Sequence, residues 1–575
     1  MFKKFTKCSI SIILAIILVM NLSSMTYIDM TLSSKISSVL LEKMDEDDTA
    51  EIPVSIWTTS PDISVMQQDL QMAVNVVQTN SDTSMMKSSK QASMDEIKMN
   101  YRTSVSEIYL TANNDFSADY IDEEDIIFVS RYAPMILANL TRKEILELSK
   151  LDSVEGIDYQ ATPRFEETDS ISAELGVSYE VLSQNYISYT GSGIKIGILD
   201  MGVPYASDIP DCNVGGIWKD ENNQYQTDEN GHCTNVTNII MQYAPDATYY
   251  FACGTEGDPA TFFEWTEWLI DQGVTLINMS RWAWEENVAD AYFNTYGNLT
   301  KWFDHIAYSH YILVVKASGH DSSNGVHSPG MSYNIITVGA MEQNNNTFTL
   351  ADYSSYYTGN VYASKPDIVA EGRYNGDSGT SYATPHVTGI VACMLECNSM
   401  LEYSPELIKA ILTSSVHADG PRFGPFMRSQ TALSYMQVGA GFANASNALT
   451  VTSNNQSRCS SLSPTQQSYS SNLVVSSDNV GCTYRVSMAY TIPAECVGVH
   501  TEGVTATNPF PNLDLEIYAP NSTTPLIVSN TTFNNVEIVE FTPQVSGTYV
   551  IKIVQTTAST DTVYWGVAWN IYTNE

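Results

Sequence analysis

The sequence predicts an α/β domain between about residues 169 and 452, with a mainly parallel sheet covered by helices on both faces. Short apolar strands alternate with helical segments along this region, and such alternation is typical of parallel sheets. The preceding segment, 30–168, mixes strand and helix patterns. The following segment, 453–575, carries β-rich runs between turn residues, which predicts a small antiparallel β-sandwich. The sequence therefore predicts three folded parts in a row.

The composition limits the classes of partner. Acidic residues outnumber basic ones by 65 to 27, which gives a net charge of −38. A surface of this sign repels phosphate backbones, and the sequence has no basic patch with interleaved aromatic residues, so nucleic-acid binding is disfavoured. The nine cysteines form no CxxC pair and no regular spacing. They therefore indicate neither a zinc site nor a disulfide scaffold.

The first 29 residues have the pattern of a secretory signal peptide. Lys3, Lys4 and Lys7 provide a positive start, and residues 10–20 form an unbroken apolar run. Because that run is short for a membrane span and is followed by small polar residues, we expect export and cleavage. The alternative is an uncleaved membrane anchor. The predicted location is extracellular or cell-surface associated, with no membrane anchor in the mature form.

Segment 30–168 has the pattern of an α+β unit. Its predicted strands are Ile52–Thr59, Ile126–Ser130, Met135–Asn139 and Val154–Tyr159. Thr141 precedes a helical pattern and has Glu144 three residues later, which is a capping-box signature.

The central segment supplies the alternation on which the fold class rests. Its strands are predicted at Ile194–Leu199, Thr248–Ala252, Thr275–Met279, Ile312–Val315 and Ile335–Val338. Its helices are predicted at Thr234–Tyr243, Phe262–Gln272, Tyr382–Glu396 and Ser404–Ser414. The sandwich strands are predicted at Leu513–Tyr518, Val536–Phe541, Thr548–Val554 and Thr562–Trp569.

Three residues of the central segment match the needs of nucleophilic hydrolysis, namely a nucleophile, a base and a group that orients the base. Asp200 follows a predicted strand, and the carboxyl ends of parallel strands are where such sheets place reactive groups. His232 precedes a predicted helix. Ser381 lies in a glycine-bearing turn that leads into a helix, where its own backbone N–H is oriented to bind an oxyanion. Each residue alone is more often a turn or cap residue, so the hypothesis depends on the three together.

The sequence around these residues resembles the subtilisin-like serine peptidases. The serine element carries the strongest likeness, through Gly379, Thr380, Ser381, Ala383, Pro385, His386, Val387 and Gly389. Further likenesses are Ala244–Ala247, Ile277–Ser280, Lys365–Ala370 and Gly439–Ala445. The resemblance implies a secreted serine endopeptidase that cleaves polypeptides through an acyl-enzyme, with Asp200, His232 and Ser381 as catalytic triad. It implies no required cofactor.

The sequence departs from that family pattern near the presumed chemistry. Met201 stands where the family has Thr or Ser, and Cys233 and Asn235 follow His232 in place of Gly and His. We interpret Cys233 as a packing residue, because neighbours on a helix point about 100° apart. His320 occupies the place of the family's oxyanion-hole asparagine. An imidazole N–H, neutral or charged, can donate to an oxyanion, so the role need not be lost.

The resemblance also implies the walls of a peptide groove. One wall would hold Ser280, Arg281 and Trp282, and the other Ala317, Ser318 and Gly319. Bulky residues stand where glycines usually follow Ser280, which predicts selectivity rather than broad digestion. Arg281 either contacts acidic substrate side chains or is simply solvated, the commoner state of an arginine.

The flanking segments fit this interpretation. Residues 30–168 resemble the propeptides of these peptidases, which template folding and inhibit through their own C-terminal tail. Relative to those propeptides, residues 63–120 are a long unmatched insertion. Residues 453–575 resemble the β-sandwich domains that follow secreted bacterial peptidases. Structural calcium is common in both domain types, but the sequence contains no complete calcium-ligand loop. Metal sites, if present, are not identified by the sequence.

Two other functions stay open at this stage. One is a weakened pseudopeptidase that binds peptides without cleaving them, motivated by Met201, Cys233 and His320. The other is a surface-binding protein that acts through the C-terminal sandwich. Intact Asp200, His232 and Ser381 argue against both, and self-cleavage of the purified precursor would separate the three hypotheses.

Overall fold

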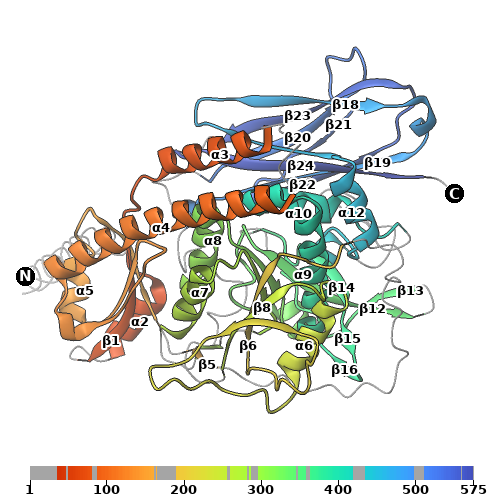
Figure 1. Cartoon of the computed structure of the whole chain (residues 1–575). Coiled ribbons are helices and arrows are strands. Elements are labelled where there is room, and N and C mark those ends of the chain that lie inside the picture. Colours follow the sequence, from red (N-terminus) through yellow and green to blue (C-terminus); the bar gives the residue numbers. More distant parts are fainter. Residues whose placement is uncertain are drawn as a thin grey trace, which may run out of the picture.

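The chain folds into an N-terminal unit, a central α/β domain and a C-terminal sandwich (Figure 1). The computed structural model describes residues 35–46, 50–79, 87–160, 163–164, 189–254, 260–281, 284–285, 296–344, 347–357, 363–418, 434–497, 510–557 and 560–573. The predicted signal peptide, 1–29, lies outside the described residues. None of the described helices is long and apolar enough to cross a membrane.

The N-terminal unit is a four-stranded antiparallel sheet with helices, as the sequence predicted. Its strands follow the order β2-β3-β1-β4 and comprise β1 (Glu51–Thr58), β2 (Ile126–Val129), β3 (Met135–Thr141) and β4 (Val154–Tyr159). Two short helices belong to it, α2 (Ser38–Glu46) and α5 (Arg142–Leu148). The predicted capping box is confirmed, because the Thr141 side chain accepts from the Glu144 N–H and the Glu144 carboxylate accepts from the Thr141 N–H.

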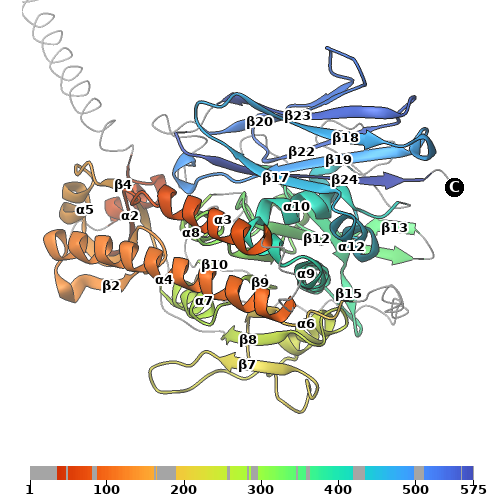
Figure 2. The ribbon, with the colours of Figure 1, turned by 45° about the horizontal axis from the view of Figure 1, so that its top comes forward.

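The insertion at 63–120 forms a helical hairpin. Its two helices are α3 (Ser64–Thr79) and the long α4 (Lys87–Tyr120). They run side by side along the central domain, and the C-terminal half of α4 continues over the N-terminal sheet, where Asn113 donates to the Ser130 and Ala133 carbonyls (Figures 1 and 2). We call residues 64–120 the helical hairpin.

The central domain is built on an eight-stranded, mainly parallel sheet, which confirms the predicted fold class. The strand order is β13-β12-β11-β9-β6-β8-β7, with β14 also paired to β12, and all pairs are parallel except β12 with β13. The strands are β6 (Lys195–Asp200), β7 (Asn213–Ile217), β8 (Thr248–Cys253), β9 (Leu276–Met279), β11 (Leu313–Ala317), β12 (Ile336–Asn344), β13 (Thr347–Leu350) and β14 (Ile368–Glu371). Two short ribbons accompany the sheet, β15 (Arg373–Tyr374) with β16 (Asp377–Ser378), and β5 (Pro163–Arg164) with β10 (Trp284–Glu285).

Helices cover both faces of this sheet. One face packs against α6 (His232–Met241), α9 (Thr380–Cys397), α10 (Pro405–Ser414), α11 (Tyr435–Val438) and α12 (Ala445–Ser453). The other packs against α7 (Thr261–Asp271) and α8 (Asn298–His310), and side chains of the N-terminal sheet join that core. Alternate residues of β6 point to opposite faces, with Ile198 in the first core and Leu199 in the second. This alternation is what a parallel strand buried on both sides requires.

The C-terminal part is the predicted antiparallel sandwich. One sheet has the order β17-β24-β19-β22, with β17 (Ser457–Leu462), β19 (Thr483–Tyr490), β22 (Val536–Phe541) and β24 (Val563–Tyr572). The other has the order β18-β23-β20-β21, with β18 (Ser468–Val475), β20 (Asn512–Tyr518), β21 (Ile527–Ser529) and β23 (Gly547–Thr557). Inward side chains of both sheets form one core.

The sandwich is seated directly on α10 of the central domain. A Cβ added to Gly566 on β24 would lie 2.4 Å from the Leu407 Cα, so only glycine permits this approach. Arg485 of β19 is fully buried and donates to the Thr413 carbonyl at 2.9 Å. Asn334 and Ile492 exchange two hydrogen bonds of 2.8 Å across the same boundary. Because these polar contacts are buried, the two parts have one relative placement.

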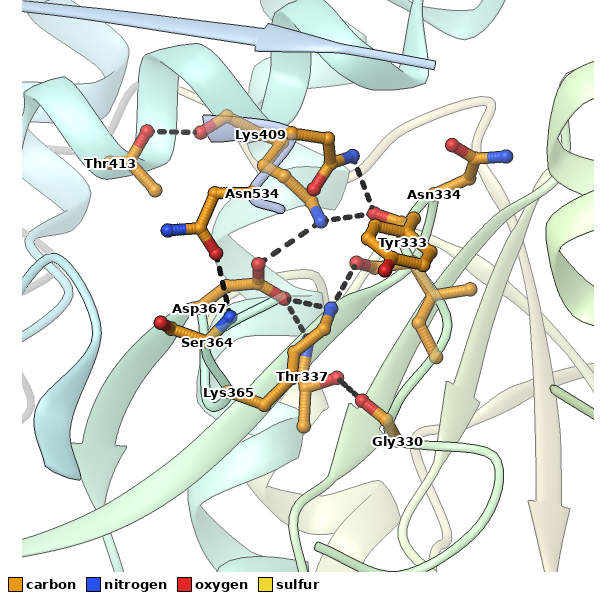
Figure 3. Close-up of polar contacts among 12 residues, drawn as sticks. Gly330, Tyr333, Asn334, Thr337, Ser364, Lys365, Asp367, Lys409, Thr413 and Asn534 are labelled. Carbon is orange, nitrogen blue, oxygen red and sulfur yellow. Dashed lines mark hydrogen bonds and ion pairs between the residues drawn. The ribbon is translucent and has the colours of Figure 1, made fainter. Parts of the chain in front are cut away.

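A buried ionic network underlies this boundary (Figure 3). The Asp367 carboxylate contacts the ammonium groups of Lys365 at 2.8 Å and Lys409 at 3.1 Å. Burial alone would raise the pKa of Asp367, but the two lysines hold it below its ordinary value. Lys409 also donates to the Tyr333 carbonyl, which accepts a second hydrogen bond from Asn535 of the sandwich. The network therefore links the sheet, α10 and the sandwich.

We predict that Asp367→Asn lowers the free energy of unfolding by roughly 3–5 kcal/mol, because it leaves two buried ammonium groups without their carboxylate. Thermal and urea unfolding followed by fluorescence would measure the change. Asp352→Asn is the matched control, since Asp352 is exposed, and it should change stability by less than about 0.5 kcal/mol. Equal effects of the two substitutions would contradict the role given to the network.

Candidate active site

Asp200 is the last residue of β6 and has no exposed surface. Its carboxylate Oδ1 accepts a hydrogen bond from the Met201 N–H at 2.7 Å. The same oxygen lies 2.7 Å from Nδ1 of His232. The side chain is thus held at the carboxyl end of the parallel sheet, where the sequence placed it, and its bond to the imidazole fixes the proton on Nδ1.

His232 is the first residue of α6, and the turn before it sets its position. Gly231 has φ +77°, a conformation that favours glycine, and the His232 N–H donates to the Asn230 side chain at 2.9 Å. Asp228 holds the start of the helix by accepting from the Thr234 N–H at 2.7 Å. Burial lowers the pKa of His232, but the charge and hydrogen bond of Asp200 outweigh it, so the pKa is raised. This environment favours the protonated imidazole that a general base becomes.

Ser381 is the second residue of α9, so its N–H has no acceptor inside the helix. Its hydroxyl donates to the Ser280 carbonyl at 2.7 Å, and the Ser280 hydroxyl donates back to the Ser381 carbonyl at 2.8 Å. That carbonyl needs a donor because Pro385, four residues on, has no N–H to offer. The Tyr382 ring centroid lies 5.7 Å from that of His232, which places the start of α9 beside the histidine.

The structure brings the three predicted residues to one edge of the sheet, but it does not join all of them by hydrogen bonds. In the described part of the chain, the Ser381 hydroxyl bonds to Ser280 and not to His232. Hydrogen bonds of this kind often tighten only when substrate is bound. The arrangement contains a buried carboxylate, a base with raised pKa and a serine at a helix start.

His320 follows β11 and lies against the turn before Ser381. Its Nε2 accepts from the Thr380 N–H at 3.0 Å, and its ring packs edge-on against Tyr353. Burial, and then the nearby His327, His232 and Lys316, lower the pKa of His320 to about 3. The imidazole is therefore neutral and, because Nε2 accepts from Thr380, carries its proton on Nδ1. Of the two donor forms left open by the sequence, the structure supports the neutral one.

The Arg281 side chain lies inside the protein, whereas the sequence analysis expected it either in solvent or in contact with acidic substrate groups. The residue is 3% exposed, and its Nη1 donates to the Asp200 carbonyl at 2.7 Å and to the Gly254 carbonyl. The guanidinium also lies over the rings of Phe262 and Trp265 of α7. The expectation of a solvated arginine is wrong, because the side chain is buried at the end of β6. Its contact with acidic substrate groups stays a prediction. Its burial lowers the pKa of Arg281 to about 9.

Among the other predicted wall residues, Ala317, Ser318 and Gly319 belong to the part of the chain that the structure describes. Ala317 and Ser318 are buried, and the Ser318 N–H donates to the Val338 carbonyl at 2.9 Å. Gly319 has φ +113°, and a Cβ there would lie 2.2 Å from the His327 ring. Trp282 lies outside the described residues. Contact of any of them with substrate stays a prediction.

The remaining predictions concern cysteine and metal. Cys233, the second residue of α6, is fully buried in the core, and burial raises the pKa of its thiol well above the ordinary value, so it packs as expected. Among the described residues, no group of three or more His, Cys, Asp or Glu side chains is arranged to hold a metal ion.

Comparisons with known proteins place the chain among peptidases. Residues 191–441 match the model of the subtilase family. The thermostable alkaline protease of Halalkalibacterium halodurans is 27% identical over 302 residues, covering 48% of this chain and 78% of that protein. Subtilisin Savinase of Lederbergia lenta is 30% identical over 230 residues, covering 36% of this chain and 78% of that protein.

The chain belongs to the subtilase family. This subtilase is a serine-type endopeptidase. Among solved structures it is also similar to the epidermin leader peptide processing serine protease of Staphylococcus aureus, at 17% identity and a TM-score of 0.40, over 59% of this chain and 95% of that one.

Sequence reasoning missed one residue of this subtilase site, Asp228, and did not predict where the Arg281 side chain lies. Asp228 anchors the start of α6 and also helps to raise the pKa of His232. An acidic residue shortly before a helical pattern is a recognisable cap signal, so the role of Asp228 could have been predicted from the sequence. The position of the Arg281 side chain could not be predicted in this way, because the rings it packs against, Phe262 and Trp265, belong to α7 and meet it only in the folded protein.

We predict that removing the charge of Arg281 raises the pKa of His232 further, because the guanidinium lowers it in the native protein. Arg281→Met should shift the histidine titration to higher pH, whereas Arg281→Lys, which keeps the charge, should shift it less. The measurement is NMR of labelled histidine in a Ser381→Ala background. Identical titration curves in native and Arg281→Met protein would exclude this electrostatic coupling.

Proposed function

We propose that this subtilase is a secreted endopeptidase, made as a precursor, that cleaves peptide bonds through Asp200, His232 and Ser381. The 2.7 Å hydrogen bond between the Asp200 carboxylate and His232 Nδ1 carries the proposal. It leaves Nε2 of His232 to accept a proton, as a general base requires. The chemistry uses only groups of the chain itself, so it requires no cofactor.

In the proposed mechanism, the Ser381 hydroxyl turns from Ser280 to His232 when substrate binds. His232 takes its proton while the oxygen attacks the scissile carbonyl, and an acyl-enzyme forms as His232 returns the proton to the leaving amine. Water then releases the acyl group by the same route. Asp200 stays ionised throughout and stabilises the imidazolium. The Ser381 N–H and the Nδ1–H of His320 would bind the oxyanion.

The N-terminal unit is proposed to act as a propeptide. Residues 163–164 form an antiparallel ribbon with residues 284–285, which follow Ser280 on the predicted wall of the groove. A strand paired in this way is bound as an extended peptide substrate would be. This pairing supports inhibition of the enzyme by its own precursor segment before release.

We predict that Ser381→Ala lowers turnover by about a factor of 10⁶ and traps the full precursor. Intact-mass spectrometry and a peptide substrate would follow both effects. Ser378→Ala, in the same turn but outside the proposed triad, is the matched control and should still be processed. Equal processing of native and Ser381→Ala protein would mean that another protease matures the chain.

We predict a maturation cut within about residues 160–175. The reason is geometric, because the segment that follows β4 must pass through the groove to be cut by its own enzyme. Sequencing of the new N-terminus after incubation of the purified precursor would locate the cut. A mature enzyme that begins before residue 150 would contradict the prediction, since β4 would then be divided from its sheet.

We predict that His320→Ala lowers turnover by about 10²–10³ while the Michaelis constant stays nearly unchanged, as for an interaction made mainly in the transition state. His320→Asn should retain most activity, because a carboxamide can accept from Thr380 and donate to the oxyanion. With its pKa at about 3, the native imidazole stays neutral from pH 5 to 9, so the loss should be constant over that range. Native turnover in His320→Ala, or a loss confined to binding, would remove the role.

A further inference from the structure

Lys316 of β11 is a buried cation without an anionic partner. The residue has no exposed surface, and among the described residues its ammonium group donates only to the carbonyl of the next residue, Ala317. An ammonium group carries three N–H donors, so this contact uses one of them. Burial lowers the pKa of Lys316 to about 7, as expected of a cation that has lost water and gained no opposite charge.

The other buried lysines in the described part of the chain are all paired. Each has a carboxylate within 4 Å of its ammonium group: Lys98 with Glu402, Lys301 with Glu155, and both Lys365 and Lys409 with Asp367. Pairing of this kind offsets the free energy lost when a charge leaves water. Lys316 departs from the pattern that the rest of the molecule follows.

A second unsatisfied polar group lies on the same side of the strand. Ser318 follows Lys316 by two positions and continues the ladder, since its N–H donates to the Val338 carbonyl at 2.9 Å. Residues two apart on a strand point to the same face of the sheet. Ser318 is buried, and its hydroxyl has no hydrogen-bond partner among the described residues. Unpaired groups of this kind destabilise a fold unless a ligand pairs with them.

These two side chains lie at the edge of the sheet where the proposed chemistry takes place. Lys316 pairs in register with Met279 of β9, the residue before Ser280. The strand leads on to His320, whose Nε2 accepts from the Thr380 N–H. The charge of Lys316 is among the causes that lower the pKa of His320, which places the ammonium group near that imidazole.

The charged groups around this edge do not satisfy Lys316. Asp321 follows His320, but its carboxylate contacts Nε2 of the buried His327, and this hydrogen bond is the main cause that lowers the pKa of Asp321. Arg281, the other buried cation at this edge, donates to two backbone carbonyls and lies over two aromatic rings. Lys316 and Ser318 therefore present donors for which the described chain has no anion.

We propose that Lys316 and Ser318 bind the acidic side chain of the substrate residue that precedes the scissile bond, so that the enzyme cleaves after Glu or Asp. The inference rests on the proposed function, in which His320 and the Ser381 N–H hold the oxygen of the attacked carbonyl. The residue that supplies this carbonyl enters beside the segment leading to His320, whereas the leaving amine lies toward His232. Its carboxylate would provide the missing anion in a charge-assisted hydrogen bond.

The predicted maturation window agrees with this preference. Residues 160–175 contain one basic residue, Arg164, and several acidic ones, namely Glu166, Glu167, Asp169 and Glu174. A precursor that is cut by its own active site must present there a side chain that the enzyme accepts. The window offers that side chain at four positions.

The test compares two peptides that differ only in Glu or Gln before the scissile bond. We expect the mature native enzyme to cleave the Glu peptide with a kcat/KM at least about tenfold higher. Lys316→Met removes the charge at similar length and should bring the ratio close to one. Lys195→Met is the matched control, because Lys195 begins β6 at the opposite end of the sheet, and it should keep the native ratio. A native ratio near one, or a native-like ratio in Lys316→Met, would overturn the proposal.

Two further measurements separate specificity from folding and from activity. A purely structural lysine would lower the cleavage of both peptides equally in Lys316→Met, and that result would also overturn the proposal. If this variant fails to fold, Ser318→Ala replaces it and should lower the Glu preference about threefold or more. Casein digestion reports activity as such. An enzyme that digests casein without preferring Glu overturns this inference alone, and one that digests nothing overturns the proposed function.

Discussion

A fully buried carboxylate governs the arrangement of the active site. Asp200 has no exposed surface, and its Oδ1 is bonded to the Met201 N–H and to His232. A carboxylate in such a place is tolerated only with hydrogen bonds of good geometry. This requirement places His232 at the first position of α6. The positive φ of Gly231 and the bond from Asp228 to Thr234 then follow as the means of starting a helix there.

The parallel sheet brings the other residues of the active site to the same place as Asp200. β6 lies between β8 and β9, and β9 lies beside β11, so the carboxyl ends of these strands meet at one edge. β6 ends in Asp200, β9 leads to Ser280 and Arg281, and β11 leads to His320. The exchange of two hydrogen bonds between Ser280 and Ser381 ties α9 to the same edge. Groups from four segments are therefore positioned by strand pairing rather than by flexible loops.

The sequence was informative where a function depends on local pattern. Asp200, His232 and Ser381 each stand at a strand end or helix start that neighbouring residues define. Four sandwich strands, β20, β22, β23 and β24, alternate clearly enough to be located, whereas β17, β18, β19 and β21 were not predicted. Prediction from sequence was poor where contacts with distant parts of the chain determine the position of a side chain. Arg281 follows β9 as a bulky cation, and nothing nearby in the sequence tells that Phe262 and Trp265 will receive it. The hairpin at 64–120 was likewise unrecognised, because its buried polar residues meet partners 172 to 304 positions away.

Helix α8 shows why the N-terminal segment matters to the site beyond blocking it. Trp57 of β1 donates to Asn298 at the first residue of α8, at 3.0 Å, while Gln67, Tyr101 and Arg102 cap its last turn. Both ends of this helix are thus held by one segment. The chain passes from α8 directly into β11, and β11 leads to Gly319 and His320 beside the serine turn. Because buried hydrogen bonds at two ends fix a helix in translation and rotation, the N-terminal segment holds α8 at the entry to β11, and the pairing of β11 with β9 and β12 then positions His320.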